Sequence, residues 1–283
     1  MVTGQENMTS KSNINLLSTH ILSVQACLNG LSFCIIDTTE NNIVFLKELT
    51  FKKQCNPIEL EEHLNTEFES NYLLQGEFKK VILIHHNNLS TFIPKALFNE
   101  RNLVDYLKFN NKIFESDFIA HDELSIQEMV SVYVPFVNIN NCFFDRFTDF
   151  EYQHANTILV QQLLQKATVF TTKIYCNVQK NTFEMVYIKE GKLNLFNSFE
   201  YTTKEDFIYY LLFTIEQLQL NTETIELILL GNIGVDDDLY SICYQYIRNV
   251  SFGTRATQFM YRNVEHKPKY GYNHFALLSS FNN

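Results

Sequence analysis

The feature that most constrains the fold is a pattern of secondary-structure signals that occurs twice. In each copy, three short β segments are followed by a helical stretch and then by a strand that is apolar along its length. The first copy comprises Ile21–Leu28, Ser32–Asp37, Ile43–Phe51, Pro57–Phe68 and Val81–Ile84. The second comprises Val169–Cys176, Phe183–Ile188, Lys192–Tyr201, Lys204–Leu218 and Ile225–Leu230. The repeat predicts two β-β-β-α-β-α units in tandem.

The first copy opens with a hairpin signal. Apolar residues alternate with other residues along Ile21–Leu28 and again along Ser32–Asp37, as expected for strands that bury one face. Asn29-Gly30 separates the two runs. Because both central residues of a type I′ turn have positive φ, Asn-Gly between alternating runs predicts a tight hairpin of this type.

The helix and strand signals predict layered packing. Asn56-Pro57 fits a helix N-cap followed by proline at the first helical position, and Thr202 with Glu205 fits a capping box. Val81–Ile84 and Ile225–Leu230 are apolar throughout, which is typical of strands buried on both faces. The sequence therefore predicts an α/β fold in which helices cover both faces of each sheet.

The material between the two copies predicts further elements. We expect a short strand, a helix, one or two strands and then two more helices, the last of which closes the first unit. These segments are Leu89–Pro94, Arg101–Phe109, Asp117–Pro135, Phe136–Phe147 and Glu151–Lys166.

The pattern also sets the expected domain organisation. A polar, mobile tail over 1–20 precedes a first unit over 21–166, which carries an inserted subdomain at about 89–135. The second unit covers 167–283 and ends in a closing helix over Asn273–Phe281. No Gly/Ser/Pro-rich linker separates the units, so we expect them to pack together.

Composition narrows the cellular compartment and the classes of binding partner that we expect for this protein. The 283-residue chain has a formal net charge of −10, which argues against broad attraction to nucleic acid or to an anionic membrane. No apolar run approaches the roughly 20 residues of a membrane-spanning helix, and the polar start does not fit a signal peptide. The cysteines form no CxxC pair, so a reduced, cytoplasmic setting is expected; they are Cys27, Cys34, Cys55, Cys142, Cys176 and Cys243.

Two stretches of sequence, together with the duplicated closing half, resemble a known protein family. They are LSVQACLNGLSFCIID (Leu22–Asp37) and VILIHHNNLSTFIPKALF (Val81–Phe98). From Ile21 onward the chain resembles a family of uncharacterised bacterial proteins, a domain of unknown function with a duplicated ribonuclease H-like fold. The resemblance implies two ribonuclease H-like units arranged as in actin-like ATPases. It implies no activity.

The nucleotide motifs of actin-like ATPases are degenerate in this chain. The resemblance places the first phosphate loop, which carries an acidic residue in the ATPases, at Asn29 and Gly30. An amide lacks the negative charge that Mg²⁺ favours in its ligands. The second loop would fall at Cys176–Thr182, which contains neither aspartate nor glycine.

One nucleotide motif is partly kept. Gly231, Asn232 and Gly234 match half of an adenosine-binding motif, and the other interpretation is a strand-to-helix turn. We therefore expect no cofactor and no catalytic residue, with ATP and Mg²⁺ at these residues and at Asn29-Gly30 as the alternative.

Other candidate sites have structural interpretations. Ribonuclease H chemistry needs a carboxylate on the opening strand, and Ile21–Leu28 has none. His85-His86 would point to opposite faces of a strand, which argues against metal chelation. Asp236–Asp238 favours a helix N-terminus over a Mg²⁺ site. Cys27 and Cys34 could face each other across the hairpin, and two buried thiols are the simpler interpretation.

The segment 248–272 combines basic and aromatic residues. Such a strip could bind RNA or an acidic protein partner, whereas the other interpretation is a solvated loop whose rings return to the core. The basic residues are Arg248, Arg255, Arg262, Lys267 and Lys269, and the aromatic ones are Phe252, Phe259, Tyr261, Tyr270 and Tyr272.

Three functions remain open. The leading hypothesis is a non-catalytic actin-like binding or scaffold protein, a pseudoenzyme with a protein partner. The second is a nucleotide-binding protein or weak ATPase or kinase that uses a cleft between the units. The third is an RNA- or protein-binding module that uses the basic-aromatic strip.

Overall fold

The computed structural model describes residues 19–109, 111–254, 258–262, 264 and 267–282. The polar tail predicted over 1–20 therefore lies almost wholly outside the described residues. The chain forms two compact units. Unit 1 is built from 19–85, 136–152 and the described part of 259–267, and unit 2 from 86–135, the described part of 153–258, and 268–282.

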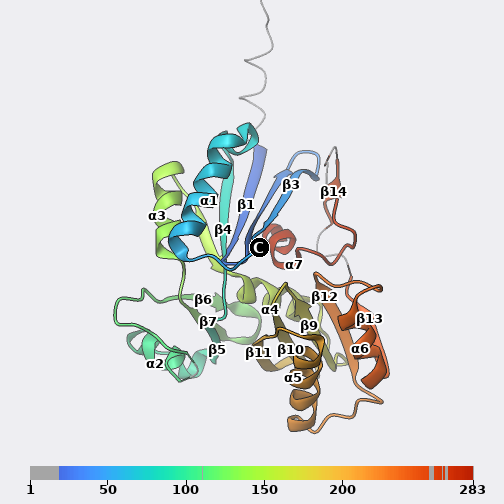
Figure 1. Cartoon of the computed structure of the whole chain (residues 1–283). Helices are drawn as coiled ribbons and strands as arrows, with labels where there is room; N and C mark the ends of the chain where they lie inside the picture. Colours follow the sequence, from blue (N-terminus) through green and yellow to red (C-terminus); the bar gives the residue numbers. More distant parts are fainter. Residues whose placement is uncertain (1–18, 110, 255–257, 263, 265–266, 283) are drawn as a thin grey trace, which may run out of the picture. The chain divides into compact units, whose positions relative to one another are not determined.

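Unit 1 contains one mixed sheet with the strand order β14-β3-β2-β1-β4-β8 (Figure 1). Lys79, next to the start of β4, donates a backbone hydrogen bond to His20 at the start of β1, so these two strands begin at the same end. The strands are β1 (His20–Cys27), β2 (Gly30–Asp37), β3 (Asn42–Thr50), β4 (Lys80–His86), β8 (Glu151–His154) and β14 (Met260–Tyr261).

The predicted hairpin between β1 and β2 is confirmed, but its turn differs from the prediction. Cys27 pairs with Gly30, so Leu28 and Asn29 form the two-residue loop, and neither has positive φ. Gly30 is instead required by a close approach, because a Cβ there would lie 2.2 Å from the carbonyl oxygen of Leu49. The expected Cys27–Cys34 juxtaposition is wrong, since Cys34 pairs with Ser23.

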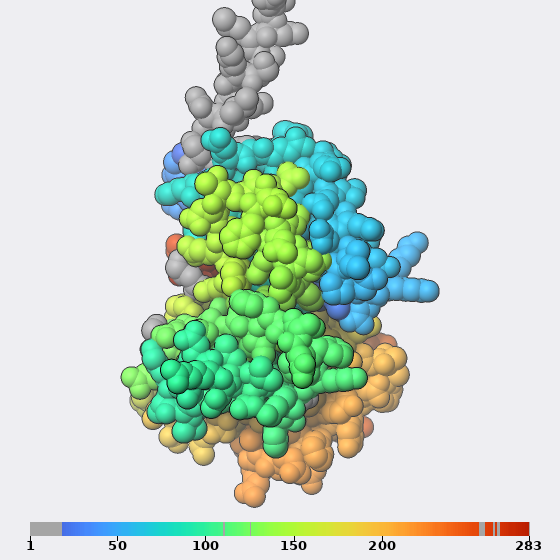
Figure 2. All heavy atoms as spheres, turned by 90° about the vertical axis from the view of Figure 1, so that its left-hand side faces the viewer, coloured from blue at the N-terminus to red at the C-terminus, as the bar shows by residue number. Residues whose placement is uncertain are grey.

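Two helices cover one face of this sheet. They are α1 (Pro57–Ser70) and α3 (Val137–Arg146), which pack against each other in Figures 1 and 2. The predicted start of α1 is confirmed: Asn56 caps the helix and forms a capping box with Glu59. The rings of Phe33, Phe68 and Phe143 meet edge-on in the core below the helices. The core that they share includes Leu22, Val24, Ala26, Leu31, Leu60, Leu64, Leu83 and Ile139.

Unit 2 contains a sheet with the order β11-β10-β9-β12-β13. This order repeats β3-β2-β1-β4-β8 of unit 1, which confirms the duplicated ribonuclease H-like topology. The two-residue turn between β10 and β11 has positive φ at both Glu190 and Gly191, as in a type I′ turn. The strands are β9 (Lys173–Val178), β10 (Thr182–Lys189), β11 (Lys192–Glu200), β12 (Glu226–Gly231) and β13 (Asn249–Phe252).

The helices of unit 2 correct two predictions. The stretch predicted as one helix from Glu151 begins as strand β8, and α4 (Ala155–Lys166) follows once His154 has capped it. The capping box of α5 (Lys204–Gln217) uses Thr203 and Asp206, one residue after the predicted pair. The remaining helices are α6 (Asp238–Tyr246) and the closing helix α7 (Phe275–Ser279).

The predicted insertion also lies in unit 2, whereas the sequence pattern predicts it in the first unit, and it has a core of its own. Strands β5 (Ser90–Pro94), β6 (Ala120–Leu124) and β7 (Met129–Tyr133) pair in the order β5-β7-β6, and α2 (Leu103–Leu107) packs on β5 and β7. Figure 2 shows this insertion in green. Its core is formed by Ile93, Leu107, Val130 and Val132.

The insertion is attached to the β10–β11 hairpin by one amide side chain. Gln127 donates to the carbonyl oxygen of Gly191 at 2.8 Å and accepts from the backbone N–H of Leu193 at 2.9 Å. The insertion also contacts β11 through aromatic rings: the ring centroids of Phe92 on β5 and Phe196 on β11 lie 4.8 Å apart. At the edge strand β11, the Gln127 side chain thus bonds to backbone groups that would otherwise pair with a neighbouring strand.

His85, near the end of β4, is a buried polar link within unit 1. Its Nδ1 accepts from the backbone N–H of Phe136 at 3.3 Å, so Nε2 carries the proton and donates to Asn140 Oδ1 at 2.8 Å. Burial lowers the pKa of His85 to about 4. The ring is therefore neutral near pH 7 and ties β4 to the first turn of α3.

We predict that Gly30→Ala lowers the free energy of unfolding by about 2 kcal/mol, because the new methyl group would overlap a strand carbonyl. Urea unfolding checks this. Asn29→Ala is the matched control, since the Asn29 side chain makes no hydrogen bond among the described residues, and it should change stability by less than about 0.5 kcal/mol. Equal effects of the two variants would contradict the close approach at Gly30.

We predict that His85 makes the protein less stable as the pH falls. Its pKa is about 4 in the folded chain and about 6.5 when unfolded, so between these values the unfolded chain binds more protons. The contribution is complete above about pH 6.5 and is lost toward pH 4, by up to about 1.4 kcal/mol per pH unit.

The measurement is the free energy of unfolding against pH for the wild type and His85→Gln. The variant should show a shallower slope between pH 6.5 and 4. His63→Gln, on an exposed residue of α1, serves as the control and should keep the wild-type slope. A wild-type slope in His85→Gln would refute the prediction.

Candidate functional site

The glycine loop of unit 2, Gly231–Gly234, follows the carboxyl end of β12. Gly231 has φ of +80°, and a Cβ there would lie 2.2 Å from the carbonyl oxygen of Val178 on β9. The next residue, Asn232, donates its backbone N–H to that same oxygen at 2.7 Å. The loop therefore needs glycine for both its backbone conformation and its close approach to β9.

The chain's own segment Tyr270–Asn273 lies on this loop. Gly231 donates its N–H to the carbonyl oxygen of Tyr272 and accepts from the Asn273 side-chain amide at 2.5 Å. The Tyr272 hydroxyl donates to the carbonyl oxygen of Ile233 at 3.1 Å. The ring of Tyr270 lies so close to Gly234 that a Cβ on the glycine would come within 2.6 Å of it. Loop backbone that could face a ligand is thus bonded or covered from within unit 2.

A shallow cavity of about 330 Å³ remains beside the loop. Asp236, Asp237 and Lys269 line it together with Tyr270. Lys269 lies 3.3 Å from Asp236, and Asp237 caps α6 by accepting the N–H of Leu239. The predicted role of the aspartates at a helix start is therefore confirmed for Asp237, and two of the three charged side chains that line the cavity pair with each other.

The two hairpins that correspond to phosphate loops present no carboxylate at their turns. In unit 1, Leu28 and Asn29 form the turn, and their carbonyl oxygens accept from Cys55 and Phe51. In unit 2, the turn after β9 closes with a hydrogen bond from Gln179 to Thr182.

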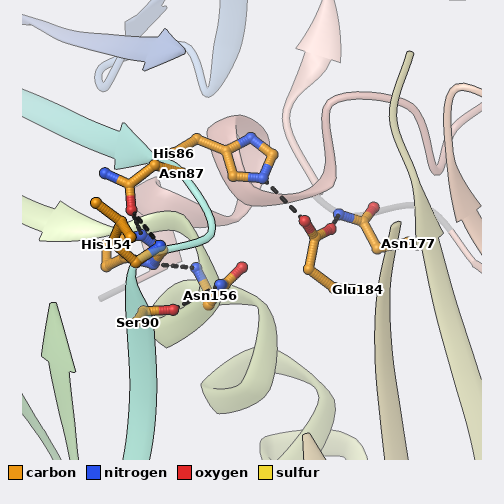
Figure 3. Close-up of polar contacts among 8 residues, drawn as sticks. His86, Asn87, Ser90, His154, Asn156, Asn177 and Glu184 are labelled. Atoms are coloured by element: carbon orange, nitrogen blue, oxygen red, sulfur yellow. Dashed lines mark hydrogen bonds and ion pairs between the residues drawn. The ribbon is translucent and has the colours of Figure 1, made fainter. Parts of the chain in front are cut away.

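A buried carboxylate does lie in unit 2, on β10, and the sequence patterns did not reveal it. Glu184 is 1% exposed and contacts His86 Nε2 through Oε1 at 3.1 Å. Its other oxygen accepts from Asn177 Nδ2 at 2.8 Å. Figure 3 shows His86 and Asn177 directed at Glu184 from β4 and β9. Both carboxylate oxygens are therefore engaged.

Asn177 connects this carboxylate to the glycine loop. With its amide nitrogen committed to Glu184, its Oδ1 points to Gly231 and would lie 2.9 Å from a Cβ at that position. The Oδ1 atom is buried and has no hydrogen-bond partner among the residues that the structure describes. A side chain at residue 231 would thus collide with the group that holds Glu184.

A second carboxylate, which is half-buried, belongs to the insertion. Asp122 accepts from the backbone N–H of His154, from Thr157 Oγ1 and from the Tyr133 hydroxyl, at 2.9, 2.7 and 3.0 Å. Burial raises the pKa of Asp122, and these three donors oppose the rise. Asp122 therefore fastens β6 to β7 and to the start of α4.

His154 extends this network. Its Nδ1 accepts from the N–H of Asn156, so the proton on Nε2 faces Asn87 Oδ1 at 3.4 Å. Asn156 in turn donates to Ser90 Oγ at 2.9 Å, and Figure 3 shows these groups together. His154 thus caps α4 through the same ring.

The described residues contain no group of three or more His, Cys, Asp or Glu side chains that could hold a metal ion. His85 bonds to α3 and His86 to β10, so the adjacent pair does not converge on one point. Within the described part of the chain, no helix is long and apolar enough to cross a membrane.

The basic-aromatic strip is divided between the units, and Arg255 lies outside the described residues. Arg262 forms an ion pair with Glu40 in unit 1, and Lys269 pairs with Asp236 in unit 2. Arg248 and Lys267 form no salt bridge among the described residues. The rings of Phe252, Tyr270 and Tyr272 stack nearly parallel on one another.

Comparisons with solved structures agree with this topology. A Bacteroides thetaiotaomicron protein with an actin-like ATPase fold and unknown function is 24% identical and has a TM-score of 0.77, covering 85% of this chain and 93% of its own. The PilM-PilN type IV pilus biogenesis complex contains a chain that is 11% identical with a TM-score of 0.50, covering 83% and 88%. The fold is therefore that of actin-like ATPases.

Comparison with curated proteins gave no match. The model of one protein family, described as "Protein of unknown function (DUF3822)", matches residues 9–250, which is most of the chain. The protein thus belongs to the DUF3822 family.

Proposed function

We propose that the protein is a non-catalytic binding or scaffold protein built on the actin-like fold. The observation that carries the proposal is the occupation of the glycine loop by Tyr270–Asn273. Two backbone groups of Gly231 and one of Ile233 bond to this segment, and Tyr270 covers Gly234. A nucleotide could reach the loop only after these contacts had broken.

The placement of the carboxylates supports the same proposal. Mg²⁺ at a phosphate site is usually bound through one or two carboxylates and the phosphates. Asn29 and the turn at 179–181 offer none. Glu184 is buried and Asp122 is half-buried, and the donors described above already bond to both. Their geometry suits cross-links between elements rather than an exposed metal ligand.

Among structures with this fold, the PilM-PilN structure is a complex between two proteins. That example is compatible with a protein-binding role for an actin-like chain. By analogy with it we propose a protein as the partner, and no resident cofactor.

A nucleotide-binding protein or weak ATPase is the alternative. The observation in its favour is the 330 Å³ cavity beside Gly234, which is lined by two aspartates and Lys269. In this version, Tyr270 acts as a removable cover over the loop. An RNA-binding role has less support, because Arg262 and Lys269 are paired with carboxylates and the rings stack on one another.

We predict that the wild-type protein shows no MgATP dissociation constant below about 1 mM, the upper end of usual substrate KM values, and no phosphate release. Isothermal titration and a phosphate assay measure these quantities. Tyr270→Ala uncovers the loop and should bind no better, because the hairpins still lack carboxylates. Tyr244→Ala, on an exposed residue of α6, is the matched control.

Micromolar binding or phosphate release in the wild type would refute the non-catalytic proposal. If binding arose in Tyr270→Ala but not in Tyr244→Ala, the alternative with a covered nucleotide site would replace it.

We also predict that Glu184→Ala lowers the free energy of unfolding by about 3 kcal/mol, because it leaves His86 and the Asn177 amide buried without their acceptor. Urea unfolding is the measurement. Glu216→Ala, on an exposed glutamate of α5, is the control and should cost less than about 0.5 kcal/mol. A Glu184→Ala protein as stable as this control would show that the carboxylate has no structural role.

A further inference from the structure

One face of the unit 2 sheet carries a row of side chains that the register places next to one another. Tyr175 on β9 pairs with Ile228 on β12, and Ile228 pairs with Ser251 on β13. Two residues back along the strands, Lys173 pairs with Glu226. Because side chains alternate between faces, these five residues share one face. They form the floor of a cavity of about 300 Å³.

The cavity has two helical walls. Leu163 and Lys166 belong to the last turn of α4, and Phe275 begins α7. Leu230 adds to the apolar part of the floor. At about 300 Å³ the cavity lies at the small end of the range for ligand pockets, so its ligand would be small.

The charges in this cavity are unbalanced. Lys173 lies 2.9 Å from Glu226 and is neutralised by it. Lys166 has no carboxylate partner among the described residues, and its ammonium lies 5.8 Å from the centre of the Phe275 ring. In a chain with a net charge of −10, the cavity thus has two lysines against one glutamate. One unpaired cation, together with the apolar side chains of Ile228, Leu230 and Phe275, complements a ligand with one negative charge and an apolar body.

We propose that this cavity binds a small amphipathic carboxylate. The carboxylate meets Lys166, and the apolar body lies on Ile228, Leu230 and Phe275. A phosphate dianion is the poorer match, because a single unpaired lysine faces the cavity. This site is separate from the glycine loop and does not depend on the proposed scaffold role.

The tyrosine hydroxyl supports the same ligand class. Burial raises the pKa of Tyr175, so its hydroxyl keeps its proton at neutral pH and can donate a hydrogen bond to a carboxylate. Ser251 at the outer edge of the floor is exposed and offers a second hydroxyl.

The test is isothermal titration of the full chain with 3-phenylpropionate and hexanoate, with 3-phenylpropan-1-ol as the neutral probe and phenyl phosphate as the dianion. We expect both carboxylates to bind at least tenfold more tightly than the alcohol and the phosphate. Lys166→Met should weaken carboxylate binding at least tenfold. Lys53→Met, on an exposed lysine of unit 1, should leave it unchanged.

A second variant fills the cavity instead of removing its charge. Ser251→Phe places a ring over the floor from an exposed edge-strand position, so the protein should keep its melting temperature but lose carboxylate binding. The proposal is overturned if neither carboxylate binds at 10 mM, if the alcohol or phosphate binds as well, or if Lys166→Met or Ser251→Phe leaves binding intact.

Discussion

The backbone at Gly231 is the constraint on which the candidate site of unit 2 depends. With φ of +80° and no side chain, this residue approaches the Val178 carbonyl and leaves room for Asn177 Oδ1. Its N–H and carbonyl groups then bond to Tyr272 and Asn273. Gly231 thus joins the end of β12 to the neighbouring strand β9 and to Tyr270–Asn273, a segment about 40 residues later in the chain.

The carboxylates of Glu184, which is buried, and Asp122, which is half-buried, show how unit 2 uses charge. An uncompensated carboxylate in a protein interior is costly, so its oxygens need donors. Asp122 has three, from three different elements, and Glu184 has an imidazole and an amide. Each carboxylate therefore links segments that are distant in sequence. The same residue types that would suggest catalysis in an open cleft act here as internal cross-links.

Short sequence patterns correctly predicted features that depend on neighbouring residues, such as a helix cap and a hairpin. Asn56 and Glu59 form the capping box where Asn-Pro indicated a helix start, and the β1–β2 hairpin forms where the alternation requires it. The prediction of Asn29-Gly30 as the turn residues was wrong. Gly30 is needed because the β3 backbone lies close to it, and its φ is not positive. Likewise, β8 replaces the start of a predicted helix, since pairing in the sheet outweighs helical propensity over four residues.

The sequence by itself determined the duplicated strand-helix order and the absence of carboxylates from the two hairpin turns. Both follow from short-range periodicity and residue identity, which need no knowledge of the fold. Only the tertiary structure decided that Glu184 meets His86 across 98 residues and that Tyr270–Asn273 covers the glycine loop. These contacts arise from packing between distant segments, and neither has a periodic signal along the chain. Tertiary packing, rather than sequence pattern, thus decides whether Gly231 and Gly234 form an open binding site or a loop that is covered by another segment of the chain.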